Sequence, residues 1–298
     1  MARVSARTIP LRDRASGQLV EERVFGGDTL ERLYGTAHGR LVRRLLRKRA
    51  PSHIYGWFKR RPASRREIPE FVASLGIDAS EAERPLAAYA SLADFFERRL
   101  RAGARPLETD PVRLSSPCDA RVTALADCAG ELEVKSSRVT LGELLDHALL
   151  ARRFERGAAL VFRLAPADYH RFHFPADGLA GPARRVAGPL ESVHPIALAA
   201  AAASFRNQRE ITLLETDRFG TLAMIEVGAM LVGTIVQTFA PGPVRRGEEK
   251  GRFRFGGSTV VLLAEPGRLE VDPDLLADSH RGVEVLVRMG TGVARTTR

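Results

Sequence analysis

The sequence contains little of what usually crosslinks a chain or anchors it in a membrane. Only two cysteines, Cys118 and Cys128, occur in 298 residues. They make neither a disulfide framework nor a metal-binding spacing, which favours a reducing compartment. No apolar stretch with a cleavage site opens the chain, so we expect no signal peptide. The longest strongly apolar run, 196–205, has about ten residues, whereas a spanning helix needs about 20. Any contact with a membrane would therefore be peripheral.

Acidic residues are missing from one segment of the chain. Residues 32–66 hold twelve Lys or Arg and no Asp or Glu, so the rest of this +10 chain sums to −2 (10 − 12). Tyr55, Trp57 and Phe58 lie inside this segment. Basic residues around aromatic anchors are typical of helices that lie on anionic bilayers, at about 1 kcal/mol per charge. Contact with RNA, or a simple solvated basic face, would give the same composition.

Helical patterns are concentrated in the first third of the chain. Residues 1–25 are polar and irregular, and 28–46 predict two short helices interrupted by glycines. The segment 68–75 predicts a helix that Gly76 ends, and 91–103 predicts another with one apolar face. We therefore expect a helical N-terminal region over residues 1–110.

The pattern changes after residue 110. Short apolar and β-branched runs are separated by Gly and Pro, and helical signal is weak apart from 140–149 and the alanine-rich 195–204. The runs that predict strands are 120–126, 131–135, 158–165, 169–174, 220–238, 258–264 and 283–288. The sequence predicts a β-rich domain over 111–298, and thus an α+β protein.

One glycine-rich stretch leads into the most apolar of these runs. Gly256 and Gly257 precede Ser258, and the run 258–264 follows directly. Glycines allow unusual backbone conformations just before a strand, so we expect Ser258 at the mouth of a buried strand. No Gly-Lys-Ser/Thr follows the glycines, which excludes a phosphate-binding P-loop. Taken alone, the stretch is also typical of an ordinary glycine turn.

Four further residues could carry chemistry. Asp119 lies in a Ser-Pro turn, His170 and His173 stand three residues apart among aromatics, and His194 precedes a proline. Each could equally be structural: turn aspartates and half-buried core histidines are common. The histidine spacing does not match a helical zinc site, so we expect no metal. In a regular strand His170 and His173 would face opposite sides, which predicts unequal roles.

Aspartate, histidine and serine together can form a nucleophilic triad. The aspartate orients the imidazole, and the imidazole takes the proton of the serine. In this chain the order would be Asp119, His173, Ser258. Such triads are defined by geometry, so the sequence alone leaves this one a hypothesis.

Several separated segments resemble the phosphatidylserine decarboxylase family, in the family's order. Residues 255–260 (FGGSTV) resemble its self-cleavage site, 169–173 (YHRFH) its Tyr-His-Arg-x-His motif, and 116–119 (SPCD) its Ser-Pro-x-Asp motif. Segments 55–66 and 91–106 are also similar to the family, and the resemblance extends over most of 25–295.

The sequence departs from the family's patterns at three places. Ala120 stands where glycine is frequent, and His194 stands where many members have asparagine. The cleavage segment has the form Phe-Gly-Gly-Ser-Thr, where other branches have Leu-Gly-Ser-Thr. The Gly-Ser bond itself is kept, so these departures leave the expected reactive groups in place.

The resemblance implies an activity and its cofactor. The Gly257–Ser258 bond would be broken by the protein itself, leaving chains 1–257 and 258–298 and converting Ser258 into a pyruvoyl group. His173, oriented by Asp119, would deprotonate Ser258. The pyruvoyl group would then form a Schiff base with the amine of phosphatidylserine and release CO2 and phosphatidylethanolamine. His170 would contact the substrate or deliver a proton, and the role of His194 stays open.

The resemblance also implies a fold and partners. The β-rich catalytic domain would be mainly antiparallel, and the two cleavage chains would stay associated, with a homodimer possible. The basic N-terminal region would hold the enzyme peripherally on the cytoplasmic side of a bacterial-like cell membrane, on anionic lipid and without nucleic acid. Two rival hypotheses remain: a pyruvoyl decarboxylase of another serine-like or amino-acid substrate, and an uncut basic module that binds RNA or membranes.

Overall fold

The structure is a computed structural model, and it describes residues 9–22, 32–33, 36, 38–39, 42, 49–135, 137–194, 197, 204–229, 234–255 and 258–297. The strands are β1 (Ile9–Asp13), β2 (Leu19–Glu22), β3 (Arg113–Ser115), β4 (Ala120–Leu125), β5 (Glu131–Val134), β6 (Ser137–Thr140), β7 (Ala159–Leu164), β8 (Arg171–His173), β9 (Gly178–Ala180), β10 (Arg184–Val186), β11 (Arg209–Thr216), β12 (Gly220–Gly228), β13 (Ile235–Gln237), β14 (Gly242–Val244), β15 (Glu249–Phe253), β16 (Ser258–Ala264), β17 (Leu269–Val271), β18 (Glu284–Val287) and β19 (Gly292–Thr296). The α-helices are α3 (Arg49–Arg60), α4 (Ile68–Leu75), α5 (Leu92–Phe96), α6 (Leu141–Leu145), α7 (Ala148–Phe154) and α9 (Pro273–His280), and short 3₁₀ helices lie at Pro62–Glu67, Ala79–Glu81, Leu86–Ala88 and Ser204–Arg206. The predicted β-rich, mainly antiparallel architecture is confirmed.

One large sheet organises the molecule. Its 11 strands follow the order β14-β9-β11-β12-β16-β7-β4-β18-β1-β2, with β10 paired to β11. All its pairs are antiparallel except β1 with β18. The central strand β16 is buried along its whole length, as the apolar run 258–264 predicts for a strand covered on both faces.

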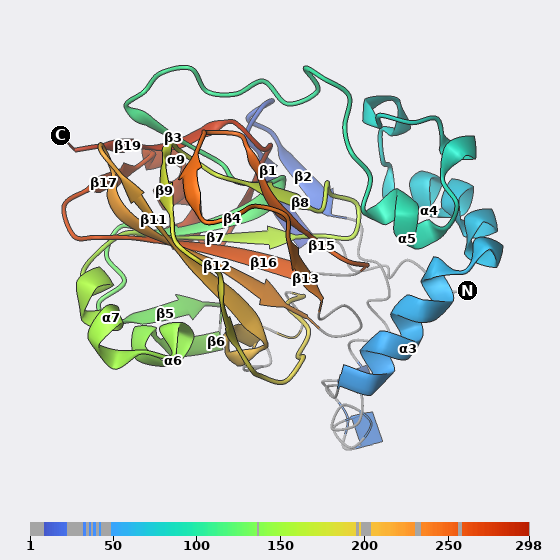
Figure 1. Ribbon diagram of the computed structural model, residues 1–298, viewed down its shortest axis with the longest axis horizontal. Coiled ribbons are helices and arrows are strands. Elements are labelled where there is room, and N and C mark those ends of the chain that lie inside the picture. Colours follow the sequence, from blue (N-terminus) through green and yellow to red (C-terminus); the bar gives the residue numbers. More distant parts are fainter. Residues whose placement is uncertain are drawn as a thin grey trace.

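Each face of the large sheet is covered by a separate apolar core. One core joins β16, β7 and β4 to the small sheet β13-β15-β8, through residues such as Phe172 and Phe253. The other core joins the opposite face to α6, α7 and the hairpin β5-β6, through residues such as Leu144 and Phe154. Figure 1 shows α6, α7, β5 and β6 gathered at the lower left of the sheet. Alternate residues of the central strands therefore enter different cores.

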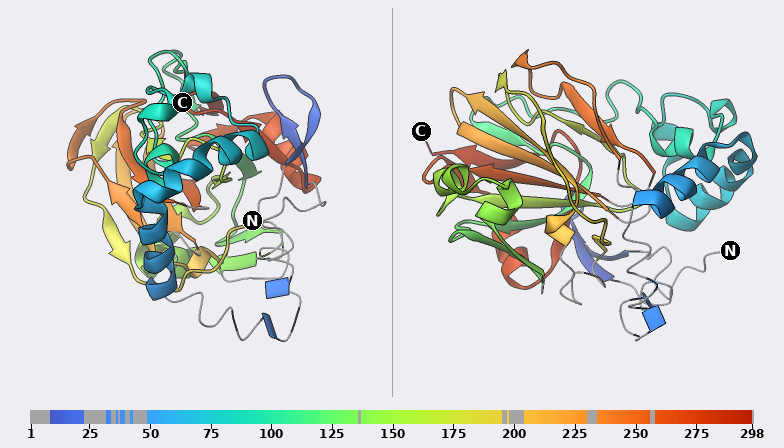
Figure 2. Two further views of the ribbon diagram at one scale, coloured as in Figure 1. Left: turned by 90° about the vertical axis from the view of Figure 1, so that its right-hand side faces the viewer. Right: turned by 60° about the horizontal axis from the view of Figure 1, so that its bottom comes forward.

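The helices α3, α4 and α5 lie together at one end of the large sheet, drawn in blue and cyan in Figures 1 and 2. They share a small aromatic core that includes Phe71, Phe95 and Phe96. Phe255, three residues before Ser258, completes this core, with its ring centroid 4.7 Å from that of Phe96. The helical region is thereby attached to the end of the sheet at which β16 begins.

The helices predicted at 68–75 and 91–103 are present, but only the first has the predicted length, and α9 was not predicted. The helix α4 ends where Gly76 adopts a left-handed φ of 65°, as predicted. The helix α5 covers only Leu92–Phe96, although its pattern predicts a helix to residue 103. Beyond it the chain pairs with an earlier segment, because Glu83 N–H donates to Arg99 O and Arg101 N–H donates to Glu81 O. These contacts replace the helical hydrogen bonds that a longer α5 would make.

The N-terminal segment differs most from its prediction. Residues 9–22 form the hairpin β1-β2, which adds to the large sheet beside β18, whereas the sequence predicts an irregular segment. Five-residue strands have weak local signals, and this one is completed by residues far along the chain. The predicted helices of 28–46 and 195–204 fall almost wholly outside the described residues. Among the residues that are described, no helix is long and apolar enough to cross a bilayer.

Candidate active site

Ser258 is the first residue of β16, as predicted. It lies between Gly228 of β12 and Leu164 of β7 in the register of the large sheet. Its side chain shares a face with Val260, which packs against the small sheet β13-β15-β8. Ser258 is fully buried, and its Oγ has no hydrogen-bond partner among the described residues. Buried hydroxyls are usually bonded, and Ser258 is one of four described residues, with Tyr89, Ser115 and Thr212, whose buried hydroxyl is not. Gly257 lies outside the described residues.

His170 lies close to Ser258 through the end of β7. Its Nε2 donates to the carbonyl of Ala165 at 3.0 Å, and Ala165 follows Leu164, the strand partner of Ser258. The ring is fully buried and stacks on Phe96 with centroids 3.9 Å apart. Its Nδ1 has no partner within the described part of the chain. Because Nε2 carries the proton, Nδ1 presents a free lone pair.

The charge state of His170 follows from its surroundings. Burial, and then the nearby positive charge of Arg98, hold the pKa of His170 well below its ordinary value. The imidazole is therefore neutral at neutral pH. A neutral, buried imidazole with one free lone pair can accept a proton or a hydrogen bond from a bound molecule.

His173 is the last residue of β8 and has different partners. Its Nδ1 donates to the carbonyl of Gly247 at 3.0 Å, and its Nε2 accepts from the hydroxyl of Tyr169 at 3.2 Å. Burial lowers the pKa of His173, while the Gly247 bond and the charges of Glu249 and Asp119 raise it in part. His170 precedes the strand and His173 ends it, so the two histidines have unequal surroundings, as the sequence predicts.

The expected hydrogen bond between Asp119 and His173 is not present. The Asp119 carboxylate instead accepts from Arg105 Nε at 2.9 Å and Nη2 at 2.7 Å, and from the backbone N–H of Met289 at 2.8 Å. A charged, two-pronged guanidinium competes better for a carboxylate than a neutral imidazole does. Asp119 still lies near His173, because the backbone N–H of His173 donates to Pro117 O at 2.8 Å.

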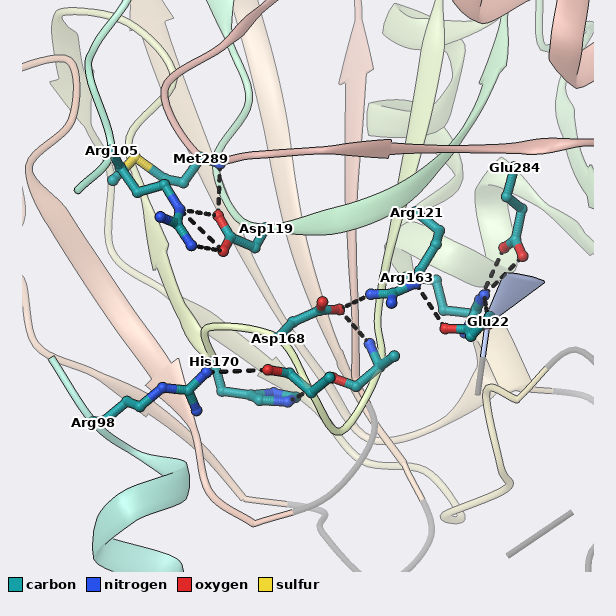
Figure 3. Close-up of polar contacts among 12 residues, drawn as sticks. Glu22, Arg98, Arg105, Asp119, Arg121, Arg163, Asp168, His170, Glu284 and Met289 are labelled. Carbon is teal, nitrogen blue, oxygen red and sulfur yellow. Dashed lines mark hydrogen bonds and ion pairs between the residues drawn. The ribbon is translucent and has the colours of Figure 1, made fainter. Parts of the chain in front are cut away.

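The loop that carries His170 is held by a buried charge network that the sequence analysis missed. Asp168 accepts from the backbone N–H of Ala165 and from a guanidinium N–H of Arg121. Burial raises the pKa of Asp168, although Arg121 opposes this. Figure 3 shows the network continuing from Arg121 to Arg163 and the glutamates on either side of it. The only signal in the sequence was that Asp168 lies directly before the Tyr-His-Arg motif.

Three arginine–glutamate contacts complete this network. Arg163 donates to Glu284 at 2.8 Å and to Glu22 at 2.7 Å, and Arg121 Nε lies 2.7 Å from a Glu22 oxygen. Glu22 belongs to β2, so the N-terminal hairpin neutralises arginines of the central strands. His194 lies in the field of this network, and burial followed by Arg163 lowers the pKa of His194 to about 4. No described contact assigns His194 a part in chemistry.

The groups at the site fit a cofactor made from the chain itself. No cluster of three or more His, Cys, Asp or Glu suited to a metal ion occurs in the described ranges. Ser258 instead presents an unbonded hydroxyl at a strand start, beside a neutral histidine. A pyruvoyl group derived from Ser258 would occupy this position without needing any further ligand.

Comparison with known proteins defines the class to which this fold and site belong. The model of the phosphatidylserine decarboxylase family matches residues 92–295. The chain therefore belongs to the phosphatidylserine decarboxylase family, whose members are carboxy-lyases.

Individual relatives extend the match to nearly the whole chain. The chain is 39% identical over 286 residues to the phosphatidylserine decarboxylase proenzyme of Desulfitobacterium hafniense, covering 94% of this chain and 96% of that protein. It is 41% identical over 292 residues to the phosphatidylserine decarboxylase proenzyme of Chlamydia caviae, covering 96% and 97%. The proenzyme of Fusobacterium nucleatum is 37% identical over 283 residues. The N-terminal part therefore also has counterparts in these relatives.

Proposed function

We propose that this chain is a proenzyme that cleaves itself between Gly257 and Ser258 and then decarboxylates phosphatidylserine to phosphatidylethanolamine. The observation that carries the proposal is the buried, unpartnered Oγ of Ser258 at the start of the central strand. The relatives are named phosphatidylserine decarboxylase proenzymes. These names and the resemblance of residues 255–260 to the family's cleavage site support the same reaction.

Self-cleavage begins when the Ser258 hydroxyl loses its proton and attacks the carbonyl carbon of Gly257. The C–N bond breaks as the new C–O bond forms, which turns the amide into an ester. Loss of the Ser258 α-proton then expels the Gly257 carboxylate and leaves a dehydroalanine. One water replaces the nitrogen, which leaves as ammonia, and residue 258 becomes the pyruvoyl cap of the second chain.

His173 is our proposed general base for this step. Because Gly247 O fixes the proton on Nδ1, Nε2 keeps a lone pair that already accepts from a hydroxyl, that of Tyr169. The Asp119 carboxylate acts on His173 through space and favours its protonated form. Asp119 therefore supports the imidazolium without the direct hydrogen bond that a Ser-His-Asp triad would have.

Once formed, the pyruvoyl group would supply a ketone for the substrate amine and an electron sink for the loss of CO2. The chain's own residues hold the substrate and manage protons. His170 is neutral, buried and open at Nδ1, so it can bind the substrate or carry the proton that replaces the carboxylate. The stacked ring of Phe96 fixes the plane of His170 for this purpose.

The two product chains are expected to remain associated. The second chain would begin with β16, which pairs with β12 on one side and β7 on the other, both from the first chain. Separation would break both ladders and expose a strand that is buried throughout. The cleaved protein is thus expected to purify as one particle.

An intact-mass measurement of the purified protein tests the proposal. We expect two masses, for residues 1–257 and 258–298, and a mass increase of the smaller chain alone after treatment with hydroxylamine, which captures ketones. One uncut mass would remove the electron sink and overturn the decarboxylase mechanism. Two chains without capture by hydroxylamine would show cleavage by another route, such as a protease.

We also propose that α3 holds the enzyme peripherally on anionic membranes. Ile54, Trp57 and Phe58 are exposed by 58%, 51% and 53%, and Arg61 stacks on Trp57 at 3.7 Å. Exposed aromatics with cations beside them are suited to the lipid interface. Phosphatidylserine is itself an anionic lipid, so such a helix would bring the site to its substrate.

The double variant Trp57→Ser, Phe58→Ser tests the membrane proposal. We expect its partition into phosphatidylserine-containing vesicles to fall at least about tenfold, because burial of each large aromatic side chain contributes about 1.5–3 kcal/mol. Leu149→Ser is the matched control, since Leu149 is 70% exposed but lies on α7. Co-sedimentation with vesicles measures both. Equal losses in the two variants, or binding that ignores anionic lipid and salt, would contradict the proposal.

A further inference from the structure

Arg98 is a buried cation that the reaction described so far does not use. It follows α5 and is only 5% exposed. Its Nη2 donates to the carbonyl of Ala167 at 3.0 Å, and its guanidinium lies over the ring of Phe95 at 4.9 Å. Its Nη1 is buried and has no partner among the described residues, and no described carboxylate lies within ion-pair distance of it.

Among the other buried arginines and lysines in the described ranges, only the Nε of Arg121 lacks a hydrogen bond, and it lies 2.7 Å from a Glu22 oxygen. Arg121 and Arg163 contact carboxylates, and Lys250 pairs with Glu226 at 2.8 Å. Arg209 lacks a carboxylate but donates to three backbone carbonyls. A buried cation with no carboxylate in contact costs free energy; Asp119 and Asp168 offset part of this cost from a distance, and a bound anion would recover more. The buried guanidinium of Arg98 is therefore suited to binding an anion.

The position of Arg98 places this site beside the reactive serine. Ala167, which Arg98 contacts, belongs to the loop between Ala165 and His170, and Ala165 follows the strand partner of Ser258. Figure 3 shows the Arg98 guanidinium reaching this loop next to the His170 ring. The electrostatic effect of Arg98 on His170 agrees with this proximity. Three unpartnered polar groups, Arg98 Nη1, His170 Nδ1 and Ser258 Oγ, thus lie around one end of β7 and β16.

We propose that the free Nη1 of Arg98 binds the phosphodiester of the substrate head group and so sets its position over residue 258. This inference rests on the proposed function. The substrate carries two anionic groups, and they behave differently in the reaction. The carboxylate loses its charge as CO2 leaves, so a cation fixed on it would stabilise the state before the reaction more than the transition state. The phosphate keeps its charge throughout, and a guanidinium N–H matches phosphate oxygens well.

Reductive trapping of small amines on the cleaved enzyme tests the proposal. The probes are ethanolamine, which has an amine alone, phosphoethanolamine, which adds a phosphate, and serine, which adds a carboxylate. Cyanoborohydride fixes each amine to the ketone of the small chain, and intact mass gives the yield. The variants are Arg98→Gln and Arg98→Lys, and Arg99→Gln is the matched control because it removes the same charge from the neighbouring exposed residue.

We expect Arg98→Gln to lower the apparent affinity for phosphoethanolamine at least about tenfold and to leave the affinity for ethanolamine unchanged. Arg98→Lys should recover part of the lost affinity. Arg99→Gln should show neither effect. A loss for serine but not for phosphoethanolamine would overturn the proposal in favour of carboxylate recognition. Equal trapping of all three probes, or equal losses for all three, would reduce Arg98 to a structural role. Absence of cleavage or trapping in the unmodified protein would instead refute the proposed function itself.

Discussion

Replacement of Ser258 by alanine is expected to leave a single uncut chain with no decarboxylase activity. The alanine has no hydroxyl to attack the preceding carbonyl, and no ketone can form at residue 258. The fold should survive, because Ser258 Oγ makes no hydrogen bond to the described residues and a buried methyl group suits this position. Intact mass and CO2 release from phosphatidylserine measure the two effects.

Thr259→Ser is the matched control for this variant. Thr259 is the next residue of β16, is also buried, and faces the other side of the sheet. Loss of one methyl group there should leave cleavage and decarboxylation nearly unchanged. Efficient cutting of the Ser258→Ala chain at the same bond would show that the serine is not the nucleophile.

Histidine variants distinguish the two stages of the reaction, which are self-cleavage and decarboxylation. If His173 is the base for cleavage, His173→Ala should accumulate as the uncut chain. If His170 acts only on the substrate, His170→Ala should cut normally but lose most decarboxylation. Asp119→Asn should also slow cleavage, because it removes the charge that favours the His173 imidazolium. The opposite assignment would hold if His170→Ala stayed uncut and His173→Ala cut at the normal rate.

Replacement of Arg163 by methionine is expected to lower the free energy of unfolding by about 3–5 kcal/mol. The change leaves Glu22 and Glu284, both buried, facing each other without the cation between them. Denaturation by urea, followed by circular dichroism, measures the loss. The Ser258→Ala background is preferable, because a single uncut chain avoids the complication of two chains.

The loss in free energy of unfolding caused by Arg163→Met should depend on pH in a defined direction. Burial alone would raise the pKa of Glu22, but Arg163 and Arg121 outweigh burial and lower it to about 2, from 4.5. A folded-state pKa below the unfolded value gives stability that is present above about pH 4.5 and is lost as the pH falls toward 2. This group contributes about 3 kcal/mol at neutral pH, at 1.36 kcal/mol per unit of pKa. The difference in stability between Arg163→Met and its parent should therefore shrink as the pH falls from about 4.5 toward 2.

Arg138→Met provides the control for this pair of measurements. Arg138 contacts Glu133 at 2.9 Å, but its side chain is 63% exposed. Exposed pairs contribute about 0–1 kcal/mol, so this variant should lose little stability at any pH. Similar losses in Arg138→Met and Arg163→Met would mean that the buried network does not stabilise the fold as proposed.

The sequence by itself determined much of the architecture. Local signals were sufficient where a strand or cap depends on its own residues: the apolar run 258–264 became β16, and Gly76 ended α4. The motifs also identified Asp119, His170 and Ser258 as candidate catalytic residues, because the resemblance depends on the order of residue types and not on distances. The family itself could thus be named before any geometry was known.

Only the tertiary structure decided which groups meet. Arg105 takes the carboxylate of Asp119 that the sequence assigned to His173, because a guanidinium from another segment binds it more strongly than an imidazole. The hairpin of residues 9–22 joins the sheet because β18, about 270 residues later, offers it a free edge. Arg98 lies beside His170 through backbone contacts of a loop and not through spacing. Such pairings are set by long-range contacts, whose partners a sequence pattern cannot identify.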